Sequence, residues 1–268
     1  MSSSHRRGRP SLVNLRSRQL GSLYRCIEVA SRSDGEGQGE ARAVVEDDFH
    51  HFRVTIRARK GRVSEAFSTA PRHPTVLCPT AGSRLVDLIG MPLSAVSAAV
   101  MQRTDARTQC THMIDLAGLA VSALARGIAR RNYAVEVPDR VDGRTHAQLH
   151  RDGEIVLQWE VDGQTIIGPK PFAGIGIGSG FTGWARDNLS LDEAEAALVL
   201  RRGVFISGGR GIDLDAPGRA TGPMGGCWVW QPDRAPLATR MVGSTLDFTG
   251  RREVLARDDQ AWLAFVEA

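Results

Sequence analysis

Hydrophobic and polar positions alternate in the early part of the chain. Between residues 52 and 57, Phe, Val and Ile alternate with Arg, Thr and Arg, as a strand with one buried face requires. Turn signals separate this segment from three similar ones, so the pattern predicts an antiparallel meander with strands at 24–32, 41–47, 49–59 and 62–69. In this register the side chain of His50 points inward and that of His51 points outward.

Helical periodicity follows the predicted meander. Two short helical stretches are expected at 82–89 and 94–103, and the longest helix at 111–130. Thr111 is the expected N-cap of the long helix, and the arginines at 126, 130 and 131 would complement the dipole at its C-terminal end. The fold class predicted from these elements is α+β, with antiparallel β meanders packed against helices.

The second half of the chain repeats several features of the first. The spacing of Tyr24, Glu28 and Arg32 recurs approximately at 133, 136 and 140, and an alignment of 98–116 with 196–214 sets His112 against Arg210. An internal duplication would pack two meanders with their helices as a pseudo-dimer. Chance similarity between two strand-rich segments is the alternative. We divide the chain into a tail at 1–21, a site-bearing half at 22–131, and a second half at 132–268 that forms a wall or lid.

The positive charge of the chain is concentrated in its tail. The 268 residues carry a net charge of +4, and five arginines fall within the first 18 residues, so the remainder is close to neutral and offers no field for nucleic acid. Residues 1–21 are polar and without periodicity, which predicts disorder. No apolar run approaches the roughly 18 residues of a spanning helix, and no signal peptide is evident. We therefore expect a cytoplasmic protein with no membrane or nucleic-acid partner, and a homodimer stays open.

The motifs of common cofactors and metals are missing or out of context. Cys78, Cys110 and His112 include soft zinc ligands, but no Cys-x-x-Cys pair occurs, and we expect no metal. The glycines at 178–183 fit the dinucleotide spacing, but no convincing strand or helix flanks them, so we interpret 174–183 as a flexible loop or lid. Only two lysines are present, which leaves little scope for Schiff-base chemistry. No organic cofactor is expected.

The start of the predicted long helix concentrates reactive groups. His112 and Asp115 stand three residues apart and so share a helix face. A carboxylate there can orient the imidazole as a general base, whereas capping of the first turn is the structural alternative. A buried His50 would need a polar partner. We predict that His50, His112 and Asp115 converge as catalytic residues; the alternative leaves His50 half exposed at a strand end beside Asp47-Asp48.

Three motifs mark the segment from 24 to 126. They are His50-x-Phe52-x-Val54-x-Ile56, Pro71-x-x-Pro74-x-x-x-Cys78-Pro79, and Cys110-Thr111-His112 at the helix start. Together they resemble the bacterial domain-of-unknown-function 2889 family. The resemblance implies that His50, Cys78, Cys110 and His112 match positions of the family pattern, and it implies no established reaction. The chain departs from the pattern at His51, where an acid is expected, and in its long second half.

These observations favour a cofactor-independent acid/base enzyme. With the resemblance, the most specific expectation is a lyase of aromatic compound catabolism that acts on a lignin-derived phenolic and releases formaldehyde by retro-aldol cleavage. The alternatives are an isomerase or hydratase on another apolar substrate, a non-catalytic small-molecule binder, and a structural or nucleic-acid partner that uses the tail. Both tryptophans of segment 227–230 are predicted on one strand face, as a wall for an aromatic ligand. The residues expected to contact the substrate are Cys78, Arg84, Cys110, His51, Trp228 and Trp230.

Overall fold

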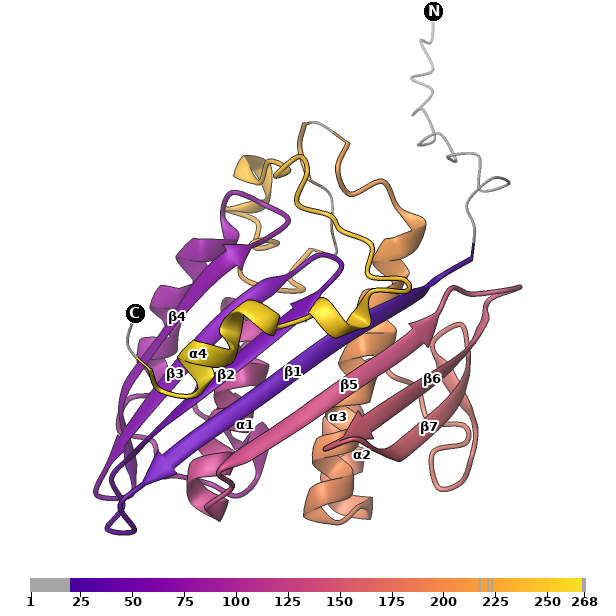
Figure 1. Cartoon of the computed structure of the whole chain (residues 1–268). Helices are drawn as coiled ribbons and strands as arrows, with labels where there is room; N and C mark the ends of the chain where they lie inside the picture. The colour runs from indigo at the N-terminus through magenta and orange to yellow at the C-terminus, as the bar shows by residue number, and fades with distance from the viewer. Residues whose placement is uncertain (1–19, 217, 221, 223, 267–268) are drawn as a thin grey trace, which may run out of the picture.

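One eight-stranded antiparallel sheet organises the part of the chain that the structure describes. The computed structural model describes residues 20–216, 218–220, 222 and 224–266, so the predicted tail lies outside the described residues except for its last two positions. The strand order is β4-β3-β2-β1-β5-β6-β7-β8, and the long helices lie on one face of the sheet (Figure 1). The predicted α+β class is confirmed.

The first four strands form the predicted meander. They are β1 (Ser22–Ser33), β2 (Gly39–Asp47), β3 (His51–Arg59) and β4 (Arg62–Arg72), each within a few residues of its expected bounds. His50 lies in the connection between β2 and β3, immediately before the first residue of β3. The predicted strand therefore begins two residues too early.

A second meander continues the sheet on the other side of β1. Its strands are β5 (Arg130–Pro138), β6 (Arg144–Arg151), β7 (Glu154–Asp162) and β8 (Thr165–Gly168). β1 pairs with β5 in antiparallel register, and the strand order is symmetric about this pair. A duplicated meander would produce this order, and the duplication itself stays a prediction.

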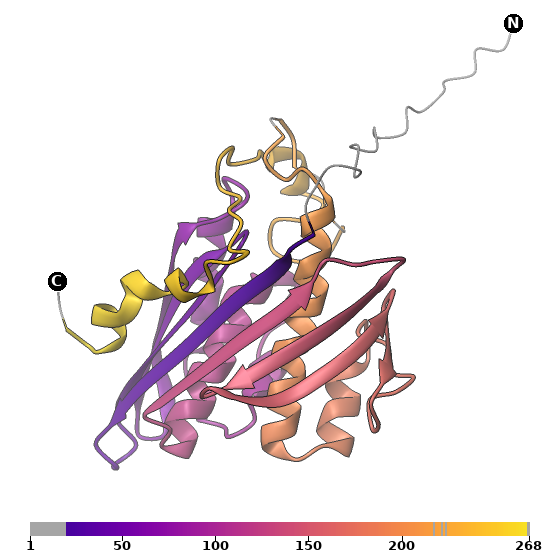
Figure 2. The same ribbon diagram turned by 45° about the vertical axis from the view of Figure 1, so that its right-hand side comes forward.

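Three α-helices cover one face of the sheet (Figure 2). They are α1 (Thr111–Arg126), α2 (Phe181–Asn188) and α3 (Leu191–Ser207). The N-cap of α1 is Cys110 and not Thr111, and Gly127 ends the helix with a φ of 65°, a conformation that glycine adopts without strain. No helix in the described part of the chain is both long and apolar enough to cross a membrane.

Several expectations for the helices need correction. The stretch expected at 82–89 lies almost entirely in a 3₁₀ helix, and the stretch expected at 94–103 is helical only over 97–102, also as a 3₁₀ helix. α2 replaces part of the loop expected at 174–183, and the arginines at 130 and 131 belong to β5. The alignment of His112 with Arg210 sets a residue of α1 against one that follows α3, and it stays a prediction together with the duplication. The 3₁₀ helices are η2 (Cys78–Leu88), η3 (Ser97–Gln102), η4 (Ala106–Thr108), η5 (Gly208–Gly211), η6 (Ala235–Leu237), η7 (Arg252–Val254) and η8 (Arg257–Asp259).

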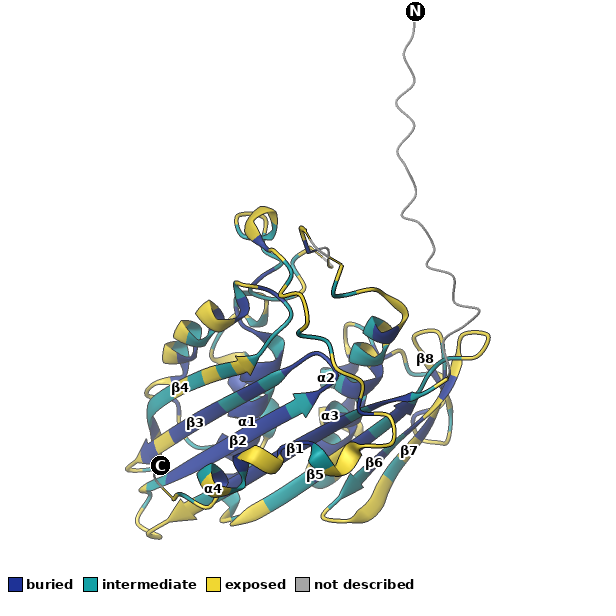
Figure 3. Ribbon diagram, turned by 45° about the horizontal axis from the view of Figure 1, so that its top comes forward, coloured by how far each residue is buried: buried dark blue, intermediate teal, exposed yellow. Residues whose placement is uncertain are grey.

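The C-terminal segment covers the opposite face of the first meander. Its last helix, α4 (Gln260–Leu263), lies across β1 to β3, and Figure 3 shows that these strands are largely buried. A second apolar cluster joins β1 and β2 to this segment, and Nε2 of His51 lies 3.0 Å from Oδ2 of Asp259. The C-terminal segment thus packs against the first meander and stabilises it. The cluster consists of Cys26, Ala30, Val44, Phe248, Leu255, Ala256 and Leu263.

Replacement of Gly118 by alanine should destabilise the packing of η3 on α1. A Cβ at this position would lie 2.3 Å from the main-chain oxygen of Ser97, so the backbone must shift. We expect the free energy of unfolding to fall by about 1–3 kcal/mol, measured by urea denaturation. Gly183→Ala in α2 is the matched control, because its Cβ would meet no atom within 4 Å. An unchanged stability of the Gly118 variant would contradict this close contact.

Candidate functional site

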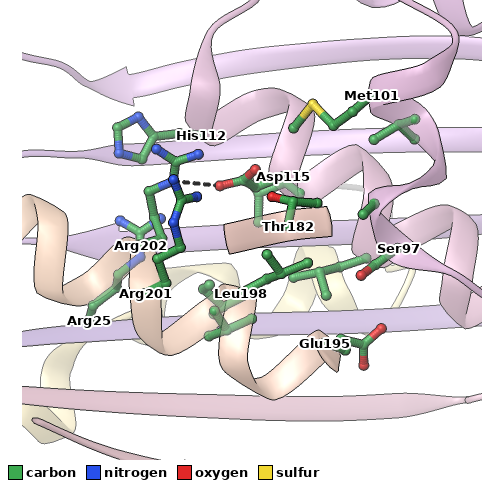
Figure 4. A pocket seen from close by; sticks show the side chains of 16 residues that line it. Arg25, Ser97, Met101, His112, Asp115, Thr182, Glu195, Leu198, Arg201 and Arg202 are labelled. Atoms are coloured by element: carbon green, nitrogen blue, oxygen red, sulfur yellow. Dashed lines mark hydrogen bonds and ion pairs between the residues drawn. The ribbon is translucent and has the colours of Figure 1, made fainter. Parts of the chain in front are cut away.

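A cavity of about 70 Å³ lies between α1, α3 and the inner face of β1 (Figure 4). Its titratable side chains come from three elements: Arg25 from β1, His112 and Asp115 from α1, and Glu195, Arg201 and Arg202 from α3. The remaining wall is largely apolar, so charged groups in the cavity are poorly solvated and interact strongly. The apolar lining residues are Ile27, Ala98, Val100, Met101, Leu116, Leu119, Leu198 and Val199.

Two imidazoles meet at one end of the site. The ring centroids of His50 and His112 lie 3.9 Å apart with a tilt of 30°, and the two residues are only 8% and 7% exposed. His112 stands in the first turn of α1 and lines the cavity, whereas His50 lies behind it in the β2–β3 connection. The structure thus brings together the two histidines that the sequence placed in one pocket.

The carboxylate that orients His50 is Asp47, at the end of β2. Its Oδ1 lies 2.9 Å from Nδ1 of His50 and accepts hydrogen bonds from the main-chain N–H groups of Phe49 and His50, each at 2.9 Å. Its Oδ2 accepts a hydrogen bond from Arg25, which is 1% exposed. Burial alone would raise the pKa of Asp47, but His50 and Arg25 hold it well below its usual range. Asp47 is therefore a fixed anion.

Asp115 lines the same cavity but does not contact an imidazole. Its Oδ2 accepts a hydrogen bond of 2.7 Å from Nε of Arg202. Figure 4 shows the Arg202 guanidinium close to His112. Asp115 therefore fixes the orientation of a guanidinium and not, as was expected, that of the His112 imidazole. The carboxylate that contacts an imidazole at this site is Asp47, which is bonded to His50.

His112 is a neutral imidazole with an unused nitrogen. Burial, followed by the nearby charges of His50 and Arg25, lowers the pKa of His112 well below its ordinary value. Its Nε2 is buried and has no hydrogen-bond partner among the described residues. Because buried polar atoms are rarely left unpaired, this nitrogen is a candidate contact for a ligand or a transferred proton.

Two groups of side chains consist of residues that can ligate a metal ion, but their existing hydrogen bonds argue against a bound metal cation. Donor atoms of Asp47, His50 and His112 lie within 4.8 Å of one another, yet both oxygens of Asp47 are already engaged and the Arg25 cation lies against it. A second group is formed on the other face by Glu46, His51 and Asp259. There the carboxylates are bonded by Arg72 and Arg53. Neither donor set fits a divalent ion without displacing a guanidinium.

The cysteines expected at the substrate site do not line the cavity. Cys78 is buried, with its Sγ 3.1 Å from Oγ1 of Thr75. Cys110 precedes α1, and burial raises the pKa of its thiol to about 12. Desolvation therefore outweighs the helix dipole, which alone would favour a thiolate. Both are protonated thiols at neutral pH.

The other expected substrate contacts also lie away from the cavity. Arg84 is paired with Asp87 at 2.6 Å, and His51 is on the opposite face of the sheet. Trp228 donates a hydrogen bond of 3.0 Å from Nε1 to Thr80. The segment 227–230 forms turns, not the predicted strand, because it is bonded locally and to the loop before α1. Trp230 does not line the cavity either.

The sequence analysis did not identify the arginines of the cavity as site residues. One signal was present: Arg25 occupies an inward position of β1, in line with the buried Leu23 and Ile27. A charged residue in such a row indicates a buried partner. Arg201 and Arg202 gave no comparable signal, since their placement depends on how α3 packs against β5 and β1.

Comparison with known proteins gives one match. The model of the family described as Protein of unknown function (DUF2889) matches residues 27–126. No curated protein matches the chain. The matched segment runs from β1 to the end of α1 and includes Asp47, His50 and His112, so this part of the chain is similar to the DUF2889 family, in agreement with its motifs.

Proposed function

We propose that the chain is an acid/base enzyme that needs no cofactor, a lyase acting on a phenolic substrate. The observation that carries the proposal is a buried, neutral His112 whose Nε2 lacks a hydrogen-bond partner, on the wall of a cavity that also contains Arg202. A neutral imidazole accepts a proton, and a guanidinium stabilises the oxyanion that forms.

The surrounding residues position these two groups. His50 stacks on His112 and is itself fixed by Asp47, so the His112 ring has little freedom to turn. Asp115 holds Arg202 through Nε, which leaves the terminal N–H groups of the guanidinium for a substrate oxygen. A preorganised donor and acceptor lose little entropy when the reaction occurs.

Retro-aldol cleavage of a hydroxymethyl compound is the reaction we favour. His112 takes the proton of the hydroxyl group, the adjacent carbon–carbon bond breaks, and formaldehyde leaves. The phenolic substrate reacts as its quinone methide tautomer, so the electron pair of that bond passes through the conjugated side chain to the ring oxygen, which acts as the electron sink. His112 then returns its proton to that oxygen, and formaldehyde and the shortened phenolic are the only products. The apolar walls suit a lignin-derived phenolic, since ligand sites are mostly apolar with a few placed polar groups.

The substrate requires a larger cavity than the one present. A cavity of about 150 Å³ accommodates benzene, which is twice the volume found here. Thr182 of α2 and Arg201 form part of the wall, and Arg201 is hydrogen-bonded to the loop before α2. We therefore propose that this loop and α2 move outward when substrate enters, as the expected lid would. A cytoplasmic location and a homodimer stay predictions.

The reaction can be tested with a pair of substrates. Purified protein without added cofactor should release formaldehyde from a hydroxymethyl-bearing phenolic, and its phenol methyl ether should react at least about 100-fold more slowly, because the ether cannot act as the electron sink. Formaldehyde and the aromatic product are measured together and should appear in equal amounts. Binding without product would favour the non-catalytic alternative, and equal rates for phenol and ether would contradict the proposed electron flow.

A further inference from the structure

One guanidinium of the cavity forms no ion pair with a carboxylate of the described residues, and the Asp115 carboxylate, which is already bonded to Arg202, acts on it only at longer range. Arg25 is paired with Asp47, and Arg202 with Asp115. Arg201 lines the same cavity and forms no ion pair within the described part of the chain. A partly buried cation of this kind requires a counter-charge.

The hydrogen bonds of Arg201 leave part of its guanidinium unused. Nε donates to the main-chain oxygen of Ile177 at 2.5 Å, and Nη2 donates to that of Gly178 at 2.9 Å. A guanidinium carries five N–H donors, so Nη1 and the second N–H of Nη2 stay available. The Phe181 ring lies beside the group, with its centroid 5.6 Å from Cζ.

The remaining acid of the cavity wall is not the missing counter-charge. Glu195 accepts hydrogen bonds from Tyr133 and from Ser122, the latter at 3.1 Å. Its oxygens also lie 3.3 Å from Arg131 and 3.6 Å from Arg126. Glu195 is thus neutralised by two other arginines, and the excess positive charge belongs to Arg201.

The first turn of α2 adds hydrogen-bond donors at the same wall. Thr182 lines the cavity, and the first N–H groups of a helix have no acceptor within the helix. None of the described residues accepts a hydrogen bond from the main-chain N–H of Thr182 or Gly183. Free N–H groups at a helix N-terminus favour an anion.

We infer that the substrate carries a carboxylate, which Arg201 and the first turn of α2 bind. The inference rests on the proposed function in taking this cavity as the substrate site. A carboxylate carries one negative charge, which matches the single positive charge of Arg201. A phosphate dianion carries two and would leave an excess negative charge in the cavity. Because the walls around Arg201 include Leu198 and Val199, the group that carries the carboxylate is apolar, and an aromatic acid fits both features.

Binding of an unreactive aromatic acid tests the inference without any turnover. The full-length protein should bind benzoate at least about tenfold more tightly than benzamide, its neutral isostere, because charge-assisted hydrogen bonds are about twice as strong as neutral ones. Isothermal titration calorimetry measures both affinities. Arg201→Gln should abolish the preference, and Arg201→Lys should keep part of it. Arg186→Gln is the matched control, since Arg186 is exposed on α2 and paired with Asp187.

Each outcome has a defined meaning. Equal affinity for benzoate and benzamide, no benzoate binding at millimolar concentration, or a full preference in a folded Arg201→Gln protein would overturn the inference. If Arg201→Gln unfolds, the comparison of the two ligands on the parent protein and on Arg201→Lys decides. His112→Gln should bind benzoate as the parent does. A His112→Gln protein with full turnover and an intact benzoate preference would remove the proposed reaction and leave the carboxylate site standing.

Discussion

Replacement of His112 by glutamine is expected to lower kcat/KM on a phenolic substrate by about 100- to 10,000-fold, the usual contribution of a general base. Glutamine nearly fills the volume of imidazole but cannot take up a proton. Formaldehyde release under steady-state conditions measures the loss, and circular dichroism reports whether the protein remains folded. His146→Gln, at an exposed position of β6, should keep the parent rate.

The pH profile and chemical rescue make this prediction more specific. Because burial lowers the pKa of His112, the base stays unprotonated as the pH falls through about 6.5, the ordinary value for histidine. The acidic limb of kcat/KM should therefore lie below that pH. His112→Ala should regain part of its activity when free imidazole is added. Full turnover of either variant without imidazole would remove His112 from the mechanism.

The first meander was predictable because its information is local. Alternation of apolar and polar side chains in β3, together with the turn at Lys60-Gly61, determines which residues pair and which face is buried. The start of α1 was wrong by one residue because Thr111 has the better capping side chain, whereas the structure uses Cys110 with no side-chain hydrogen bond. α2 was missed because Gly180 and Gly183 lower its helix propensity. In the structure the packing of Phe181 against Trp159 stabilises this helix.

The candidate site was only partly predictable for a similar reason. The alternation of buried and exposed positions places His50 on the inner face of the sheet, and the helix that carries His112 packs on that face. The rings of the two histidines do lie in contact. The choice between Asp47 and Asp115 as partner depends on the turn that follows β2, where two main-chain N–H groups and a side chain converge on one carboxylate. No periodic pattern encodes that turn.

The arginines of the cavity illustrate a second limit. Arg201 and Arg202 come within reach of His112 because β1 pairs with β5 and α3 packs over both. That pairing joins residues 100 to 116 positions apart, and its register follows from burial across the whole sheet. A single sequence gives the strands but not this register, so the second half was expected only as a wall or lid and its arginines were not assigned to the site.

Replacement of Asp47 by asparagine should be the most destabilising single change at the site. Arg25 is 1% exposed and Asp47 fully buried, so the variant leaves a buried guanidinium without its counter-charge. Breaking such a pair costs about 3–5 kcal/mol, a large share of the roughly 5–15 kcal/mol that stabilise a domain. Urea denaturation at pH 7 measures the loss. Asp162→Asn, whose carboxylate is half exposed and pairs with Arg144, should change stability by less than about 1 kcal/mol.

The pH dependence of this difference tests its electrostatic origin. The pKa of Asp47 is lowered in the folded protein, so its stabilisation is complete above the unfolded value of about 3.9 and is lost as the pH falls below it. The stability difference between the parent and Asp47→Asn should therefore begin to shrink at about pH 4 and decrease progressively as the pH falls further. Arg25→Met combined with Asp47→Leu should be less destabilised than Asp47→Asn, because neither charge is then buried alone. A stability difference that persists unchanged to pH 2 would show that Asp47 acts through packing and not through its charge.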